Sequence, residues 1–325
     1  MSDSQCEGAL LYAFDVFPDG QGKSLSAADL DAPLSEGAAY RWVHFDINHS
    51  RALSEVEKLS DAFVAGALTL PDTRPRADAH DTGILLNLRG VNLNPESDPE
   101  DMVSIRLWVT SELIISTRIR RLMAVVEIRT AIEAGRGPDS PAEFVRDLAV
   151  GLTENMNNVI GNLSEAVDLL EDRSLDDPRG LRSEITGLRR TVIMLRRYIA
   201  PQREALARFA TSGARLMDAD DHIMMRESTD RVTRLVEELD ALRERAAILY
   251  DQLTDARAEE MNRHMMVLSV IAAIFLPLGF LTGLLGINVG GVPMAGNPFG
   301  FAVTCIVCFI LAGGLLAYFR HLKWL

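Results

Sequence analysis

Met265 to Leu285 reads MMVLSVIAAIFLPLGFLTGLL, and Phe299 to Phe319 reads FGFAVTCIVCFILAGGLLAYF. At ~1.5 Å of rise per residue, each stretch forms a helix about 31 Å long, which is enough to cross the hydrocarbon core of a bilayer. No Asp, Glu, Lys, Arg or His occurs from Met265 to Phe319. The sequence therefore predicts two transmembrane helices, at 265–285 and 299–319, and excludes a wholly soluble chain.

The segment between the two spans, 286–298, reads GINVGGVPMAGNP and is rich in Gly and Pro, which predicts a loop. Two spans joined by so short a loop form a hairpin, with both flanks on one side of the membrane. Arg263 and His264 precede the first span and a basic tail, 320–325, follows the second, whereas the loop has no charge. The positive-inside rule then places both termini in the cytoplasm and the loop in the periplasm, in a multi-pass protein of the cell inner membrane.

The composition excludes several classes of function. The 325 residues include 33 Lys+Arg and 46 Asp+Glu, so the formal net charge is −13, which disfavours a nucleic-acid partner. Three cysteines, two of them in the apolar block, do not suggest a disulfide-stapled secreted protein, and the first residues lack the pattern of a signal peptide. No Walker loop, Ser/His/Asp arrangement or metalloprotease motif is present, so we expect neither an enzyme nor a bound cofactor.

The part of the chain before the spans begins with a mixture of strand and helix patterns. Apolar or alternating runs predict strands at Leu10–Val16, Tyr40–Ile47, Gly83–Leu88, Val103–Val109 and Leu113–Thr117. Helical patterns cover roughly 52–68 and 121–133. We therefore expect a cytoplasmic α/β domain at 1–137.

Residues 138–264 are expected to form a cytoplasmic helical region and stalk. Ser140-Pro141-Ala142-Glu143 is a typical helix start, Asp177-Pro178 marks a second, and Ser212-Gly213 marks a break before a third helix. From Ala219 no Gly or Pro occurs until Pro277. This predicts one helix of about 67 residues, ~100 Å long, that continues into the first span.

Gly286-Ile287-Asn288, directly after the first of two C-terminal spans, resembles the signature of the CorA family of divalent-cation transporters, which is Gly-Met-Asn or Gly-x-Asn. The following Val289–Pro293 is similar to the zinc-transporter (ZntB) branch of that family. Further similarity lies in three segments of the α/β domain and at the C-terminal Lys-Trp-Leu: 73–76, 88–95, 102–108 and 323–325. The resemblance implies a homopentamer with a cytoplasmic funnel and a central pore.

The resemblance also implies the residues of the pore. Its entrance would be a ring of Asn288 amides beside Gly286 and Ile287, which suits a hydrated cation because amide and carbonyl oxygens are hard ligands. Zinc stripped of its water would instead require His or Cys, and the first span has neither. An ungapped alignment from the signature gives the pore-lining residues as Asp251, Asn262, Leu268, Leu276 and Gly279. Leu268 and Leu276 would form apolar rings that close the pore by dewetting.

A few other polar residues could act on ions. His264, with Glu259 and Glu260, lies at the inner mouth and could bind metal or protons, although an interfacial anchor is the simpler interpretation of His264. Cys305 and Cys308 form a CxxC, which inside an apolar helix is better read as two small packing residues. His44 and Asp46 share one face of a predicted strand, where we expect a hydrogen-bonded polar face rather than a metal site.

These patterns predict membrane transport of a divalent cation, with Zn²⁺ first and Mg²⁺, Co²⁺, Ni²⁺ or Cd²⁺ as further cargo, through a homopentameric pore in the lipid bilayer. Transport coupled to protons is compatible with this hypothesis. Two alternatives remain at this point: a Mg²⁺/Co²⁺ channel of the broader family, and a non-conducting membrane-anchored receptor or scaffold.

Overall fold

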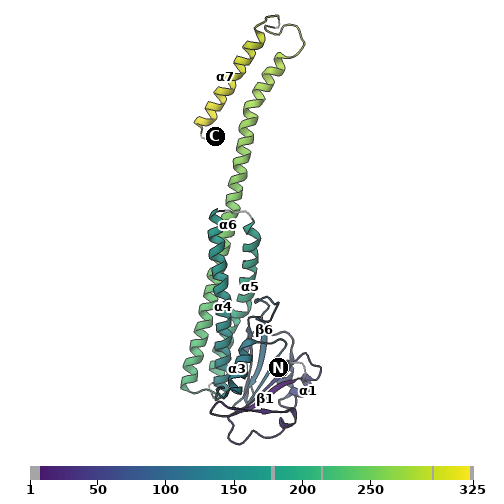
Figure 1. Ribbon diagram of the computed structural model, residues 1–325, viewed down its shortest axis with the longest axis vertical. Helices are drawn as coiled ribbons and strands as arrows, with labels where there is room; N and C mark the ends of the chain where they lie inside the picture. The colour runs from purple at the N-terminus through teal and green to yellow at the C-terminus, as the bar shows by residue number, and fades with distance from the viewer. Residues whose placement is uncertain (1–7, 177–179, 214, 295, 323–325) are drawn as a thin grey trace. The chain divides into compact units, whose positions relative to one another are not determined.

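A computed structural model describes residues 8–176, 180–213, 215–294 and 296–322. The chain divides into two compact units, Met1–Tyr250 and Asp251–Leu325. Figure 1 shows the helices and strands along the chain.

The first unit contains a seven-stranded sheet of order β2-β1-β3-β7-β6-β5-β4, in which only the β3–β7 pair is parallel. The strands are β1 Leu10–Val16, β2 Gly22–Leu25, β3 Tyr40–Asp46, β4 Arg76–His80, β5 Gly83–Gly90, β6 Val103–Val109 and β7 Leu113–Arg118. All five expected strands are present, with ends within two residues of the prediction. The two strands that the sequence did not predict, β2 and β4, are the edges of the sheet.

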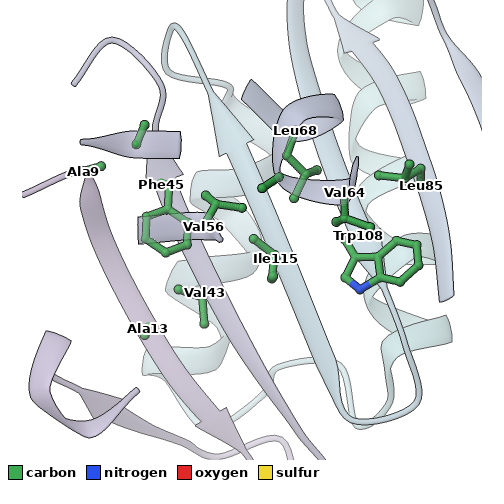
Figure 2. Close-up of a cluster of buried hydrophobic side chains, with 12 residues drawn as sticks. Ala9, Ala13, Val43, Phe45, Val56, Val64, Leu68, Leu85, Trp108 and Ile115 are labelled. Atoms are coloured by element: carbon green, nitrogen blue, oxygen red, sulfur yellow. The ribbon is translucent and has the colours of Figure 1, made fainter. Parts of the chain in front are cut away.

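One face of the sheet is covered by two short helices, α1 (Ala52–Val56) and α2 (Ala62–Thr69). They enclose an apolar core in which Phe45, Ile115 and Trp108 from three strands lie beneath side chains of both helices, as Figure 2 shows. The prediction of one helix at 52–68 is wrong, because α2 has its own start: the carboxylate of Asp61 accepts a hydrogen bond from the Val64 amide at 2.8 Å.

Longer helices follow the sheet: α3 (Met123–Glu133), α4 (Pro141–Asp176), α5 (Leu181–Ser212) and α6 (Ala219–Leu285). α4 starts as predicted, since Ser140 Oγ accepts a hydrogen bond from the Glu143 amide, and it packs Phe144 against Trp42 of the sheet at 4.9 Å between ring centroids. α4 and α5 run side by side in Figure 1. The expected helix start at Asp177-Pro178 lies outside the described residues.

The sheet contains a buried ion pair between neighbouring strands. Asp15 on β1 and Arg41 on β3 are directly opposite each other, and the Arg41 Nε and Nη2 atoms donate to the two carboxylate oxygens at 2.7 and 3.0 Å. The remaining guanidinium hydrogens bind the carbonyls of Leu30, Ala32 and Pro33. Burial alone would raise the pKa of Asp15, but the hydrogen bonds from Arg41 and Ser35 outweigh it and hold the pKa below its ordinary value.

His44 is a second buried polar group of the sheet. It is fully buried, its ring stacks on Tyr12 at 4.9 Å between centroids, and its Nδ1 lies 2.7 Å from Ser116 Oγ. Ser116 also accepts a hydrogen bond from the Trp42 indole and donates to the Val43 carbonyl, so the hydroxyl accepts from a neutral His44 that has its proton on Nδ1. Burial, with Arg118 and Arg129 nearby, holds the pKa of His44 well below its usual range.

This burial predicts an acid-dependent loss of stability. Above pH ~6.5, His44 is neutral in both the folded and the unfolded chain, so it adds no pH dependence. Below pH ~6.5 the unfolded chain takes up a proton that the folded chain does not, and the free energy of unfolding falls by up to about 1.4 kcal/mol per pH unit. Thermal melts between pH 7.5 and pH 5 should therefore show a shallower decline for His44→Gln than for the unsubstituted chain. Equal slopes would contradict the burial of a neutral imidazole.

The second unit contains the end of α6 and one further helix, α7 (Gly300–His321). α6 is a single helix of 67 residues, as the sequence predicted, and it includes Pro277. Within the described part of the chain, α6 and α7 are the two helices long and apolar enough to cross a membrane. α7 begins one residue after the expected second span and ends two residues beyond it.

Candidate functional site

Asn288 lies in a tight turn just beyond the end of α6. The Val289 amide donates a hydrogen bond to the Ile287 carbonyl at 3.0 Å, which makes Asn288 the central residue of a three-residue γ-turn. Its side chain is exposed, and it makes no hydrogen bond to any described residue of the same chain. The turn therefore presents a primary amide whose oxygen is available to a ligand.

Gly286 directly follows Leu285, the last residue of α6. Its amide donates to the Thr282 carbonyl at 3.0 Å, and a Cβ at this position would lie only 3.1 Å from that same oxygen. A larger residue here would push against the helix end, so glycine keeps the backbone of the turn close to the last carbonyls of α6. Gly279 and Gly283 lie inside α6, and a Cβ at either one would meet no described atom within 4 Å apart from the neighbouring backbone of the helix itself.

The expected pore-lining residues lie on one side of α6. At about 100° per residue, they fall within an arc of about 120° around the helix axis. They are Asp251, Asn262, Leu268, Leu276 and Gly279. In the single chain this stripe is uncovered, since 67% of Leu268 and 78% of Leu276 are exposed. A stripe of large apolar side chains with polar residues at one end is suited to line a channel formed by several copies.

The expected inner-mouth residues lie elsewhere on the same helix. By the same helical spacing, Glu259, Glu260 and His264 are about 100–140° from the middle of the stripe. All three are exposed. They would therefore act at the rim of a pore and not along its axis.

Other candidates from the sequence do not gather into a metal site. Cys305 and Cys308 are free and half-buried on α7. Asp46 lies at the end of β3 and accepts hydrogen bonds from Asn48, while His49 Nδ1 accepts from the Arg51 amide. Among the residues that the structure describes, no three His, Cys, Asp or Glu side chains are placed to hold a metal ion together. His44 forms a hydrogen bond with Ser116, as expected for a hydrogen-bonded polar face of the strand rather than a metal site.

The three segments of the α/β domain with family similarity meet at Arg89, a residue whose role the sequence did not reveal. Arg89 donates to the carbonyls of Thr73 and Met102 and to the Asp72 carboxylate, at 2.7, 3.2 and 2.9 Å. Its guanidinium carbon lies 4.1 Å from the centroid of the Tyr198 ring on α5. Arg89 therefore joins β5, the segment before β4, the start of β6 and α5. These contacts give the three segments a shared structural role in the α/β domain.

Comparison with known proteins agrees with this arrangement. The family model described as "CorA-like Mg2+ transporter protein" matches residues 37–321. The zinc transport protein ZntB of Pectobacterium carotovorum subsp. carotovorum (strain PC1) is 36% identical over 310 residues, which cover 94% of each chain. The divalent cation transporter CmaX of Pseudomonas aeruginosa is 37% identical over an alignment of 336 positions, which covers 99% of each chain.

The solved structure of full-length CmaX has the same fold, with a TM-score of 0.85, 35% identity, and coverage of 99% of this chain and 100% of that one. The family match, the full-length relatives and the shared fold, with its α/β unit, long helix and apolar C-terminal helices, lead to one conclusion: the chain belongs to the CorA family of metal-ion transporters.

Proposed function

We propose that the chain is a subunit of a divalent-cation transporter with Zn²⁺ as its principal cargo, and that it catalyses no chemical reaction. The observation that supports this most directly is α6, whose uncovered stripe runs through an apolar span and is followed by the exposed amide of Asn288. The names of the relatives agree, since ZntB is called a zinc transport protein and CmaX a divalent cation transporter.

A pore requires several copies, because two helices per chain cannot enclose one. We infer a homopentamer in the lipid bilayer, with the stripe of each α6 turned towards a common axis. Asp251 and Asn262 then form inner acidic and polar rings, Leu268 and Leu276 form apolar constrictions, and Gly279 widens the middle of the pore. Gly286, Ile287 and Asn288 form the entrance.

The charges around the spans support an orientation in the inner membrane. Arg263 and His264 precede the first span and Arg320 and His321 follow the second, whereas the loop between them has no charge. This pattern supports cytoplasmic termini and a periplasmic loop. A cation would then meet the Asn288 ring on the periplasmic side and the Asp251 ring on the cytoplasmic side.

The entrance chemistry supports a second candidate cargo. A ring of amide and carbonyl oxygens binds a hydrated cation through its water, and such ligands suit Mg²⁺ and Co²⁺ as well as hydrated Zn²⁺. A Mg²⁺/Co²⁺ channel is therefore the alternative. Ni²⁺ and Cd²⁺ are expected as competing ions in either case.

Flux into liposomes distinguishes these functions. The full-length protein is reconstituted with a metal-sensitive dye inside, and Zn²⁺, Mg²⁺ and Co²⁺ are supplied separately and in competition. Saturable Zn²⁺ entry that Mg²⁺ inhibits only weakly supports the zinc transporter. Preferred entry of Mg²⁺ or Co²⁺ supports the alternative, and no entry of any of the three ions supports a non-conducting receptor or scaffold and contradicts the proposal.

If transport is coupled to protons, the coupling must use groups outside the bilayer, because Met265–Phe319 has no titratable carboxylate or imidazole. On the cytoplasmic side of the span, the groups that we assign to this role are Asp251, Glu259, Glu260 and His264. We expect Asp251→Asn and His264→Ala to change the pH dependence of Zn²⁺ flux, and Asp230→Asn, an exposed carboxylate early in α6, to leave it unchanged. An unchanged pH dependence of Zn²⁺ flux in both Asp251→Asn and His264→Ala would favour uncoupled channel behaviour.

A further inference from the structure

The cytoplasmic unit ends at Tyr250, and the next residue, Asp251, is the innermost member of the proposed pore stripe. Buried residues recur along α6 at helical spacing as far as Leu253: Leu242, Ala246 and Leu249 are each at most 3% exposed, and Leu253 is 9% exposed. From 254 to 269 every side chain of α6 is exposed in the single chain. Tyr250 therefore lies in the last turn of α6 that is buried before this exposed stretch.

This turn is held by an arginine of α5. Arg182, the second residue of α5, donates from Nε to the Tyr250 hydroxyl at 2.7 Å, and its Nη2 also donates to that hydroxyl. The Arg182 guanidinium carbon lies 4.7 Å from the centroid of the Tyr250 ring. A single tyrosine thus receives hydrogen bonds and a cation–π contact from one side chain, which fixes both the position and the direction of the ring.

A second arginine connects the same part of α6 to α4. Arg245 of α6 donates from Nε and Nη2 to the Glu171 carboxylate, at 3.1 and 2.7 Å, and also contacts Asp168. Arg173 of α4 in turn pairs with Glu184 of α5 at 2.7 Å, so the ends of α4 and α5 are connected to each other. The part of α6 from Arg245 to Tyr250 is therefore bound to α4 through Arg245 and to α5 through Tyr250.

We propose that Arg182 is a positioning residue for transport: by binding Tyr250 it fixes the rotation of α6 at Asp251, and so sets the width of the acidic ring at the inner end of the pore. Tyr250 and Asp251 are consecutive residues of one helix, so a rotation of the tyrosine about the helix axis moves the carboxylate with it. Arg182 touches no ion and acts only through Tyr250. This inference rests on the proposed transport function.

The test compares Zn²⁺ flux in liposomes for the unsubstituted chain, Arg182→Ala, Tyr250→Phe and the double variant. We expect Arg182→Ala to lower the maximal rate about threefold or more without changing the Zn²⁺ concentration at half-maximal rate, because the Asn288 entrance is intact. Tyr250→Phe retains the ring and should have a smaller effect. The double variant should be no slower than Arg182→Ala alone, because both changes remove one interaction.

Arg196→Ala is the matched control. It breaks an ion pair between the same two helices, in which Arg196 binds Asp240 at 2.6 and 3.0 Å, but Asp240 lies eleven residues before Asp251. We expect its maximal rate to stay within about 1.5-fold of the unsubstituted chain, and Arg182→Lys, which keeps the charge, to recover part of the lost rate.

Three results would overturn the inference: an unchanged rate in Arg182→Ala, an equal loss in Arg196→Ala, or multiplicative losses in the double variant. If sizing chromatography shows that Arg182→Ala does not assemble, the test rests on Tyr250→Phe, which removes only one hydroxyl. An unchanged maximal rate in Tyr250→Phe then counts against the inference. Absence of flux in the unsubstituted chain would instead contradict the proposed transport function itself.

Discussion

Asn288→Ala is expected to abolish nearly all Zn²⁺ flux while the protein still assembles. The γ-turn exposes the Asn288 amide, whose side chain has no hydrogen-bond partner among the residues that the structure describes, and the loop from 286 to 298 contains no carboxylate that could replace it. Several neutral amide oxygens can orient the water around an entering cation without binding it too tightly to release. Alanine removes these oxygens and leaves an apolar rim at the proposed entrance of the pore.

Flux measured with a metal-sensitive dye, together with sizing chromatography, checks this expectation. Asn288→Asp should bind cations more tightly but release them more slowly, because a ring of negative charge stabilises the bound ion. Asn297→Ser is the matched control in the same loop: Asn297 Oδ1 accepts a hydrogen bond from the Phe299 amide at 2.9 Å, and a serine hydroxyl can accept the same bond. Near-normal flux in an assembled Asn288→Ala protein would rule out Asn288 as the entrance ligand.

The membrane unit could be predicted closely because one physical requirement dominates it. A span must be long and apolar, and no charged residue interrupts the sequence from Met265 to Phe319, so the ends of both helices were predictable within two residues. The absence of Gly and Pro before Pro277 likewise predicted the full length of α6. The γ-turn at Asn288 was not predictable, because its backbone conformation leaves no pattern in the residue types.

The two edge strands show where periodicity fails. In β4, Arg76–His80, only Ala77 is buried, and in β2, Gly22–Leu25, no residue is. An edge strand exposes much of its surface, so it shows neither the alternation nor the apolar run that marks an inner strand. Hydrogen bonds to a neighbouring strand hold such segments in the sheet, and these depend on register that a single sequence does not reveal.

The polar connections within the first unit depend on register in the same way. The sequence placed Arg89 in a segment of family similarity, but its contacts with Thr73 and Met102 arise only when β5 lies between β4 and β6. Arg182 and Tyr250 are 68 positions apart, and only the packing of α5 against α6 brings them together. Residues that act through such contacts are therefore found from the structure, whereas the proposed pore stripe was placed on α6 by the resemblance to the family.

Arg41→Ala is expected to lower the free energy of unfolding by about 3–5 kcal/mol, because it leaves the Asp15 carboxylate buried without its partner. Asp15 is fully buried, and Arg41 gives it two hydrogen bonds while also binding three carbonyls of the segment from Leu30 to Pro33. Because the pKa of Asp15 is lowered in the fold, its stabilisation is complete above its unfolded pKa and is lost as the pH falls through the folded value. Denaturant or thermal unfolding of the full-length protein in detergent at neutral pH measures the loss.

The matched control is Arg231→Ala, which breaks an exposed pair with Glu227 one helical turn away and should change stability by no more than about 0.5 kcal/mol. Asp15→Leu combined with Arg41→Met should be less damaging than Arg41→Ala alone, since it removes both charges and fills the space with apolar side chains. Equal losses in Arg41→Ala and Arg231→Ala would show that the pair between β1 and β3 does not stabilise the sheet.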